Sequence, residues 1–431
     1  MKLYISGISG TGLGPLALMA KQAGIEVCGS DLAEGAITTE LKKAEIEVKI
    51  GKQDGEYLKK KLQDGVDWFV YTSALPDEHA ELAMAREAGI KITKRDDLIA
   101  YLVEKLGLKM VAVAGTHGKT TTTSVIVWAA LKLKLPVSYL VGTTLGFAPS
   151  GAYHTGDKYF IYEADEYDRN FLKYHPWLAV VPYVSYDHPD TYPTEKDYTS
   201  AFEQFKSQSE KVIEKTSHGI RWKNIGEPIF KESDFELAGR ARRIDASLAA
   251  EAVYEMMSEE LNFDNGVIED GIVDTNVIVD VINKFPGVGR RFEKLADGIY
   301  SDYAHHPEEV KATIEVAMEQ AKIDGKKGVV AIYEPHQNAR QHEVRDGYMN
   351  AFVGADKVIW LPTYLTRENP DLTVISPEEF IDGLENKEKA EPAELSDELW
   401  QRIKEYVKDN YLVLLMTAGP ADIWLRKHLK K

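Results

Sequence analysis

Residues 110–123 read Met-Val-Ala-Val-Ala-Gly-Thr-His-Gly-Lys-Thr-Thr-Thr-Thr. The apolar start of this stretch predicts a buried strand, which runs into a turn bracketed by Gly115 and Gly118. Lys119 and Thr120 then open a predicted helix. Glycines let backbone N–H groups approach phosphate oxygens, and a helix N-terminus adds a favourable dipole. The stretch therefore predicts a phosphate-binding loop, in which Lys119 would neutralise the β- and γ-phosphates and the Thr120 hydroxyl would bind Mg²⁺.

This loop is the shorter Gly-Thr-x-Gly-Lys-Thr form of the phosphate-binding motif. The general form has a glycine five positions before Gly118, where this chain has Val113. A glycine-rich turn that arises by chance is the structural alternative. It is disfavoured because the predicted strand, the loop, the lysine and the threonine follow one another at the spacing of the motif. The loop is expected to be exposed, so that Lys119→Ala should abolish turnover and leave the fold intact.

Carboxylate and imidazole side chains follow the next two predicted strands. Glu163 comes directly after the apolar residues 159–162, and Asp187 and His188 follow the apolar residues 178–184. Acidic loops are often only solvated, but a carboxylate at a strand end beside a phosphate loop is well placed to hold Mg²⁺. The order of these segments therefore predicts a two-metal site that includes Glu163 and His188.

Outward from the loop, short apolar strands alternate with amphipathic helical segments, which is typical of parallel α/β domains. Little periodicity in residues 104–109 and a Pro/Gly hinge signal at residues 285–289 indicate two boundaries. We therefore expect an α/β protein of three domains, namely residues 1–106, 107–285 and 286–431. Domains average roughly 150 residues, so a chain of 431 residues is also expected to contain about three domains.

A second glycine-rich turn lies near the N-terminus. Residues 2–6 predict a strand, the turn spans residues 7–14, and an acidic residue follows at Asp31. A dinucleotide-binding fingerprint has the same order, but Pro15 replaces its third glycine. Because the glycine spacing does not match, an NAD-dependent oxidoreductase is disfavoured, although it stays open as an alternative. A turn with a purely structural role is a second alternative.

The composition argues against several classes of protein. Lys and Arg number 52 and Asp and Glu number 69, which gives a net charge of −17. That acidity argues against binding a nucleic-acid backbone or an anionic membrane through bulk electrostatics. No apolar run approaches the roughly 18 residues of a membrane helix, and the N-terminus lacks a signal-peptide pattern. The single cysteine, Cys28, excludes internal disulfides and thiolate zinc clusters, so we expect a soluble, cytoplasmic protein.

Taken together, these motifs resemble those of the Mur ligases, the ATP-dependent amide ligases of peptidoglycan precursor synthesis. The most specific matches are the phosphate loop and the Asp-Tyr-Ala-His-His-Pro stretch that begins at Asp302. The matching segments run nearly end to end, at residues 7–12, 28–31, 72–74, 115–120, 163–168, 187–188, 290–293 and 302–307.

The resemblance implies a Rossmann-like first domain that binds UDP-N-acetylmuramate and a central P-loop-type ATPase domain. It also implies a Rossmann-like third domain that binds the amino substrate. In the implied reaction, ATP phosphorylates the lactyl carboxylate of the sugar. The amine of L-alanine then attacks the acyl phosphate, and ADP and phosphate are released. Two divalent ions, Mg²⁺ or Mn²⁺, are implied because a carboxylate must approach a triphosphate of like charge.

The resemblance also implies the residues of each site. The UDP-sugar contacts are Gly7, Gly10, Thr11, Gly12, Asp31 and Ser73. The ATP contacts are Gly115, Thr116, His117, Gly118, Lys119, Thr120, Thr121, Arg291 and Asp302. The metal ligands are Thr120, Glu163 and His188, and the amino-substrate contacts are Tyr303, His305, His336 and Arg340. The catalytic residues are Lys119, His188, Arg291 and His305, although His305 has an alternative structural role at the helix that Pro307 begins.

The chain departs from the family pattern in two places. Tyr183 stands where the family has an asparagine. The family's adenine-contact segment has become residues 239–245, with Ala241, Arg242 and Asp245 in place of His, Asn and Asn. An amide both donates and accepts hydrogen bonds, whereas Arg242 only donates and Asp245 only accepts. We therefore expect weaker or altered nucleotide selectivity, which a panel of purine nucleotides would measure.

The amine donor is left open between L-alanine and a murein tripeptide. Residues 333–340 combine a Pro-His pair that resembles the alanine ligases with a Glu-Pro pair and Asn338 that favour the tripeptide ligases. The short chain favours the small amine. A non-catalytic relative that only binds a nucleotide-sugar is a further alternative, but the retention of Lys119, Glu163 and His188 argues against it.

Overall fold

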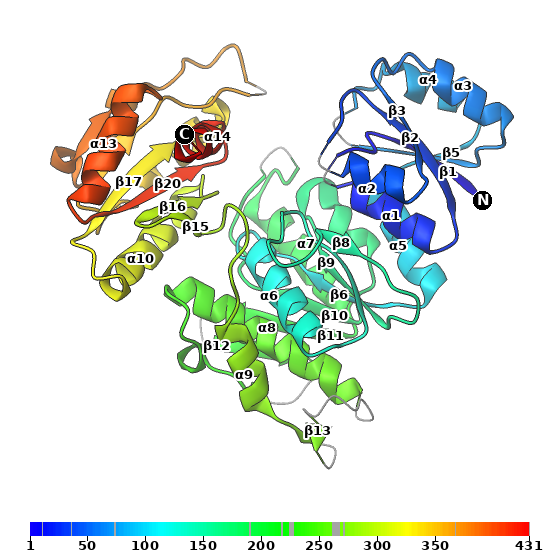
Figure 1. The fold of residues 1–431 in the computed structure, drawn as a ribbon, viewed down its shortest axis with the longest axis horizontal. Helices are drawn as coiled ribbons and strands as arrows, with labels where there is room; N and C mark the ends of the chain where they lie inside the picture. The colour runs from blue at the N-terminus through cyan, green and yellow to red at the C-terminus, as the bar shows by residue number, and fades with distance from the viewer. Residues whose placement is uncertain are drawn as a thin grey trace. The chain divides into compact units, whose positions relative to one another are not determined.

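A computed structural model describes the chain in α/β domains built on three large sheets (Figure 1). The described residues are 1–10, 12–35, 37–72, 75–188, 191–216, 219–223, 228–260, 268–269, 272–366 and 368–430. The expected α/β class with three sheet-containing domains is confirmed. None of the described helices combines the length and apolar character needed to cross a bilayer.

The N-terminal sheet has five parallel strands in the order β3-β2-β1-β4-β5. Its strands are β1 (Lys2–Ser6), β2 (Glu26–Asp31), β3 (Glu47–Ile50), β4 (Trp68–Tyr71) and β5 (Lys91–Lys94). The helices between and after them are α1 (Gly14–Gln22), α2 (Thr38–Lys43), α3 (Glu56–Gln63), α4 (Ala80–Glu87) and α5 (Arg95–Leu106). The strand order reverses between β1 and β4, and open α/β sheets bind ligands at the carboxyl ends of the strands at such a point.

The middle sheet has seven strands in the order β12-β11-β10-β6-β9-β7-β8. They are β6 (Lys109–Val113), β7 (Val137–Leu140), β8 (Gly151–Ala152), β9 (Tyr159–Glu163), β10 (Leu178–Val181), β11 (Lys211–Thr216) and β12 (Gly219–Lys223). The associated elements are α6 (Lys119–Lys132), η1 (Tyr167–Lys173), α7 (Glu195–Ser207), η2 (Glu232–Asp234), α8 (Arg240–Glu259), β13 (Ile268–Glu269), β14 (Ile272–Val273) and α9 (Thr275–Asn283). Because β10, β6 and β9 are adjacent and parallel, the loops that follow them meet at one edge.

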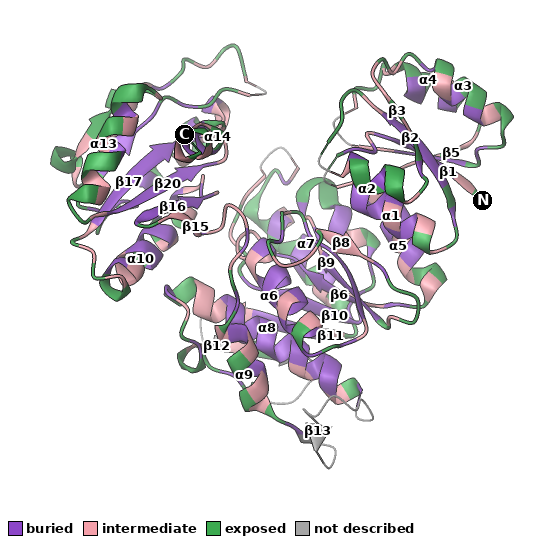
Figure 2. Cartoon of the chain, viewed as in Figure 1, coloured by how far each residue is buried: buried purple, intermediate pink, exposed green. Residues whose placement is uncertain are grey.

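The C-terminal sheet has six strands in the order β15-β16-β20-β17-β18-β19. They are β15 (Glu293–Ala296), β16 (Ile299–Asp302), β17 (Val329–Glu334), β18 (Lys357–Trp360), β19 (Ala390–Pro392) and β20 (Leu412–Thr417). The helices are α10 (Pro307–Ile323), α11 (Asn338–Val344), η3 (Arg345–Tyr348), α12 (Pro377–Ile381), η4 (Lys387–Lys389), α13 (Asp397–Lys408) and α14 (Ala421–Leu429). The strands β16, β17 and β20 are buried throughout, whereas most residues of α13 are exposed or half-buried (Figure 2).

The chain forms two compact units, which are described separately below. The first unit comprises Met1–Lys231 and Asp245–Phe285, and the second comprises Glu232–Ile244 and Pro286–Lys431. The N-terminal and middle sheets belong to one unit because they share a single buried apolar cluster, which runs through α5 into β6. The division of that unit between residues 106 and 107 stays a prediction.

One expectation about an individual element is wrong. Residues 104–106 are not an irregular break, because α5 continues to Leu106 and ends at Gly107 in a left-handed conformation (φ +65°). Its apolar face (Leu98, Ile99 and Leu102) is buried, whereas the last turn has exposed charges at Glu104 and Lys105 and only half-buried apolar residues, which weakens the periodicity. The adenine-contact segment is helical from Arg240 onward, because α8 begins there.

Candidate active site

The phosphate loop has the backbone that its two glycines allow. Gly118 is the N-cap of α6 with φ +83°, and a Cβ there would lie 2.7 Å from Asp245 Oδ1 and 2.9 Å from Pro182 Cβ. A Cβ on Gly115 would lie 2.7 Å from the carbonyl oxygen of Tyr183. Because Gly118 has no side chain, no side-chain cap covers the first N–H groups of α6. An anion can therefore approach this helix terminus closely.

The segment after β10 fastens the loop in place. The N–H of Thr116 donates to the carbonyl oxygen of Tyr183 at 2.8 Å, and its Oγ1 donates to the carbonyl oxygen of Ser185 at 2.7 Å. The same hydroxyl accepts the N–H of Ser185 at 2.9 Å and lies 2.7 Å from the hydroxyl of Tyr198. The ring of His117 stacks on Tyr183 at 5.7 Å. The tyrosine that departs from the family pattern thus holds the loop through its backbone and its ring.

An ion pair inside the protein holds Lys119. Its ammonium donates to both carboxylate oxygens of Glu166, at 2.9 and 2.8 Å, and to the carbonyl oxygen of Gly115. The side chain of Lys119 is 17% exposed and that of Glu166 is 1% exposed. Burial alone would lower the pKa of Lys119, but the charge and hydrogen bonds of Glu166 outweigh burial and raise it. The expectation of an exposed loop is therefore wrong, since every residue from 115 to 121 is buried or half-buried.

Thr120, in the first turn of α6, faces Glu163, the last residue of β9. Thr120 Oγ1 donates to Glu163 Oε1 at 2.7 Å, and the N–H of Gly142 lies 3.3 Å from Glu163 Oε2. The two residues meet because β6 and β9 pair in parallel register. A hydroxyl and a carboxylate so close together are ligands that Mg²⁺ favours, so the pair fits a divalent cation.

His188 follows β10 in a strained backbone conformation. Its φ is +57°, which is uncommon for a residue other than glycine and is typical of functional sites. Its Nε2 lies 3.8 Å from Glu166 Oε1 and 3.7 Å from Asp187 Oδ2, and its ring packs edge-on against Tyr167 at 5.3 Å. One imidazole beside two carboxylates fits a second divalent cation.

A pocket of about 380 Å³, called the larger pocket below, opens at the switch point of the N-terminal sheet. Its lining is Gly7, Gly10, Gly12, Leu13, Asp31, Thr72, Lys94, Arg95, Asp96, Asp165, Tyr167 and Asn170. The carboxylate of Asp31 accepts the N–H of Ser9 at 2.8 Å, which fixes the glycine turn. Four of the predicted UDP-sugar contacts line this pocket, and the other two, Thr11 and Ser73, lie outside the described residues.

A second pocket of about 190 Å³, called the smaller pocket below, lies beside the phosphate loop. Its lining is Gly12, Arg95, Lys119, Leu140, Val141, Gly142, Tyr162, Glu163 and Asp165. It thus brings together residues predicted for three different ligands, the UDP-sugar (Gly12), ATP (Lys119) and a metal ion (Glu163). A sugar carboxylate reaching this pocket would lie next to the phosphate loop.

In the second unit, Asp302 lies at the carboxyl end of β16. Its Oδ2 accepts the N–H of Phe292 at 2.6 Å, and its Oδ1 accepts the N–H of Ala304 at 2.8 Å. Burial raises the pKa of Asp302, and the charge of Arg291 opposes this rise. The guanidinium of Arg291 lies 5.1 Å from the ring centre of Tyr303. The predicted pair Arg291 and Asp302 is thus together, and the role of Asp302 toward a ribose stays a prediction.

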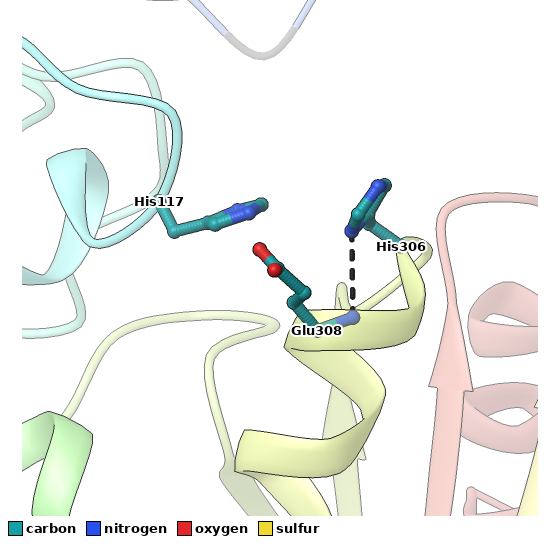
Figure 3. A group of neighbouring side chains, drawn as sticks. All are labelled: His117, His306 and Glu308. Carbon is teal, nitrogen blue, oxygen red and sulfur yellow. Dashed lines mark hydrogen bonds between the residues drawn. The ribbon is translucent and has the colours of Figure 1, made fainter. Parts of the chain in front are cut away.

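Two adjacent histidines at the start of α10 have different roles. His306 is the N-cap, and its Nδ1 accepts the N–H of Glu308 at 3.4 Å (Figure 3) in a capping box with Glu309. His305 precedes the helix, with Nδ1 3.1 Å from Glu309 Oε2 and 3.2 Å from the carbonyl oxygen of Tyr303. The side chain that caps α10 is therefore that of His306 and not that of His305.

A row of rings continues across the carboxyl ends of the C-terminal strands. The ring centre of His305 lies 5.5 Å from that of Tyr303 and 6.1 Å from that of His336. His336 in turn lies 5.7 Å from Tyr364. Arg340, the fourth predicted amino-substrate contact, is half-buried on α11. Three of the four predicted residues thus form one surface that a small amino acid could contact.

The adenine-contact segment engages the protein itself. Arg243 donates to Glu319 at 2.7 Å, and the guanidinium of Arg242 lies 5.8 Å from the ring centre of Phe292. Both arginines lie in the first turns of α8, which begins at Arg240. The prediction of altered nucleotide selectivity remains a prediction.

The residue-level predictions missed two members of the first unit's site. Glu166 lies within the matching segment 163–168 but has no predicted role of its own, although a lysine buried in a phosphate loop needs a counter-charge. Arg95 lines both pockets, and its signal was the charged run Lys-Arg-Asp-Asp at residues 94–97. Neither role follows from spacing, because both depend on contacts between distant segments.

Comparison with known proteins gives matches over most of the chain. The family models "Mur ligase family, catalytic domain", "Mur ligase middle domain" and "Mur ligase, glutamate ligase domain" match residues 2–105, 113–224 and 290–419. A UDP-N-acetylmuramate–L-alanine ligase from Fusobacterium nucleatum is 31% identical, over 97% of this chain and 94% of the relative. One from Symbiobacterium thermophilum is 30% identical, over 98% of this chain and 92% of the relative. The crystal structure of UDP-N-acetylmuramate–alanine ligase from Thermotoga maritima superposes with a TM-score of 0.73 at 23% identity, covering 100% and 98% of the two chains.

Proposed function

Because the chain belongs to the Mur ligase family, we propose that it uses ATP to join L-alanine to UDP-N-acetylmuramate in peptidoglycan precursor synthesis. The relatives named above, at about 30% identity over nearly the whole chain, support alanine as the amine donor. A cytoplasmic location belongs to the same proposal and is consistent with the single buried cysteine, Cys28.

The chemistry explains why a phosphate loop stands beside a sugar pocket. An amine does not displace an oxygen anion from a carboxylate at neutral pH. Transfer of the γ-phosphoryl group to the lactyl carboxylate converts that oxygen into part of a phosphate leaving group. The amine nitrogen then bonds to the carbonyl carbon, the C–O bond to phosphate breaks, and the amine loses a proton.

Each residue of the first unit has a role in this proposal. The first N–H groups of α6 and the ammonium of Lys119 hold the phosphates of ATP. Thr120 and Glu163 would hold one divalent cation, and His188 a second. Bound there, Mg²⁺ or Mn²⁺ would screen the repulsion between the carboxylate and the triphosphate. Lys119 alone cannot do so, because Glu166 already neutralises its charge.

The second unit supplies the remaining contacts in the proposal. Arg291 binds ATP phosphates and Asp302 the ribose, whereas the row of Tyr303, His305 and His336 receives the amino acid. His305 lies 3.1 Å from a carboxylate oxygen of Glu309, so its imidazole is oriented and can exchange a proton with an amine.

One observation carries the proposal most directly. The smaller pocket is lined both by Gly12, from the turn that follows β1, and by Lys119 and Glu163 of the phosphate loop and its metal pair. Phosphoryl transfer to a sugar-borne acid requires these parts to be adjacent, and simple binding of a nucleotide-sugar does not.

Phosphate release from purified protein tests the proposal. The protein receives ATP, Mg²⁺ and UDP-N-acetylmuramate, with L-alanine, glycine, L-serine or the murein tripeptide as single amine donors. Release that requires the sugar and is fastest with L-alanine supports the proposal. Preference for the tripeptide would assign the chain to the tripeptide ligases, and sugar binding without turnover with any amine would favour a non-catalytic relative. An absorbance change with NADH would indicate a redox enzyme instead.

A further inference from the structure

The two pockets of the first unit share three lining residues, Gly12, Arg95 and Asp165. Arg95 is the cationic side chain common to both linings. Lys94 lines the larger pocket and Lys119 the smaller one. A substrate that reaches from one pocket into the other therefore passes the guanidinium of Arg95.

Local packing fixes the position of this guanidinium. Arg95 is the first residue of α5, and a Cβ on Gly12 would lie 3.2 Å from Arg95 Nη1 and 3.7 Å from Cδ. The glycine thus leaves room for the arginine to lie flat against the turn. The side chain of Arg95 is 30% exposed, so part of it faces the pockets.

The protein leaves most hydrogen-bond donors of Arg95 unused. Among the described residues its acceptor is Asp96, with Nη2 3.4 Å from Oδ1. That same oxygen accepts the hydroxyls of Tyr174 at 2.7 Å and Tyr162 at 3.2 Å. A guanidinium carries five N–H donors, so several remain for a ligand.

The charges of the smaller pocket single out Arg95 for an anionic ligand. Glu163 and Asp165 make the lining acidic, and Lys119 already donates to both oxygens of Glu166. Within the described part of the chain, Arg95 is paired over the 3.4 Å contact with Asp96, so it is the cation available to an acid that enters from the larger pocket. A guanidinium recognises a carboxylate through two parallel hydrogen bonds.

We propose that Arg95 binds the reacting carboxylate of the nucleotide-sugar and holds it toward the phosphate loop. This inference rests on the proposed function, because it takes the acid substrate from there. The diphosphate of the same substrate is the other possible anion. Its expected place is the glycine turn at the start of α1, and Arg95 packs against Gly12 of that turn but also lines the smaller pocket, so the experiment must distinguish the two anions.

Direct binding of two nucleotide-sugars tests the inference without requiring turnover. UDP-N-acetylmuramate and UDP-N-acetylglucosamine share the diphosphate, but the second lacks the lactyl carboxylate. Titration calorimetry is done on the wild type and on Arg95→Met, Arg95→Lys and Arg86→Met. Arg86→Met is the matched control, because Arg86 is an exposed arginine of the same sheet domain that pairs with Asp77 outside both pockets.

We expect Arg95→Met to bind UDP-N-acetylmuramate about 30-fold more weakly and UDP-N-acetylglucosamine within about threefold of the wild type. Arg95→Lys should recover part of the loss, and Arg86→Met should bind both ligands normally. An equal loss of affinity for both ligands would assign Arg95 to the diphosphate and overturn the proposal. Unchanged binding of both ligands would also overturn it. If Arg95→Met does not fold, Arg95→Lys provides the test. Lysine lacks the paired donors of a guanidinium, so Arg95→Lys should weaken the binding of UDP-N-acetylmuramate alone, by about fivefold.

The binding test is distinct from the test of function. If the wild type releases no phosphate yet binds the carboxylate ligand more tightly than Arg95→Met does, the proposed reaction fails and the role of Arg95 stands. If turnover is normal and the two variants at position 95 bind like the wild type, the reaction stands and the role of Arg95 fails.

Discussion

At the scale of single residues, Lys119 and Glu166 form a pair whose members cannot be removed independently. Removal of the ammonium alone leaves a carboxylate that is 1% exposed without its counter-charge. Removal of both charges restores the balance but also removes the contact to phosphate. Stability and catalysis at Lys119 can therefore be separated by a double variant.

We expect Lys119→Met to lower the free energy of unfolding by about 3 kcal/mol, because a buried charge loses its partner. Turnover should fall at least about 100-fold, because the phosphates lose a preorganised cation. Lys119→Met combined with Glu166→Gln should recover most of the stability and none of the activity. Urea unfolding and phosphate release measure the two quantities. A single variant as stable as the wild type would contradict the ion pair.

A second buried carboxylate, Glu251 on α8, gives a prediction about pH. Its Oε1 accepts the N–H groups of Ile229 and Phe230, both at 2.8 Å, and burial raises the pKa of Glu251 from 4.5 to about 7. A carboxyl whose pKa is raised in the folded state stabilises it at low pH and loses that contribution as the pH rises. Relative to Glu251→Gln, the free energy of unfolding of the wild type should therefore fall by about 3 kcal/mol between pH 4.5 and 7.5. Denaturant titrations over that range measure the difference, and a constant difference would refute the prediction.

Sequence reasoning placed the loop residues correctly at this scale and misjudged their surroundings. The spacing of glycine, lysine and threonine is a local property, and the structure reproduces the predicted strand, turn and helix. The exposure of Lys119 is not local, because it depends on Glu166, 47 positions along the chain. The same holds for Arg95, whose neighbour Gly12 comes from the first turn of the chain.

At the scale of elements, the start of α6 depends on Gly118. A non-glycine residue at φ +83° is strained, and a Cβ would also collide with Asp245 Oδ1 and Pro182 Cβ. The backbone strain and the collision are separate effects. Gly65 separates them, because its φ is +86° and, apart from its chain neighbours, no described residue has a heavy atom within 4 Å of a Cβ built there.

We expect Gly118→Ala to weaken ATP binding at least about tenfold and to lower the free energy of unfolding by about 2–3 kcal/mol. Gly65→Ala should cost about 1 kcal/mol, which is the backbone strain alone, and should leave ATP binding unchanged. Equilibrium binding and denaturant unfolding give both values. Equal behaviour of the two variants would show that the collision has no effect.

Most elements of the site were predictable because their hydrophobic pattern is strong. The strands β6, β9 and β10 lie where apolar runs predicted them, although β10 ends at Val181, three residues before the predicted end. Polar helix termini were not predictable in this way. The first turns of α8 are charged, so they do not show the apolar period that marks a helix, whereas the last turn of α5 keeps that period in Leu102 and Leu106.

At the scale of the whole molecule, the first two sheets belong to one compact unit. The buried cluster that they share includes Leu102 of α5 and Met110 of β6, and the carboxylate of Asp96 accepts the hydroxyls of Tyr162 and Tyr174. A motif scan does not reveal such sharing, because each sheet has its own complete α/β pattern. The consequence is functional, since both pockets are built within this single unit.

The transfer of an oxygen isotope tests the central claim most directly. UDP-N-acetylmuramate labelled with ¹⁸O in its lactyl carboxylate is converted with ATP, Mg²⁺ and L-alanine, and the released phosphate is analysed by mass spectrometry. An acyl phosphate places one carboxylate oxygen in the phosphate that leaves, so one ¹⁸O atom per phosphate is expected. Unlabelled phosphate, released while the amide forms, would contradict the account.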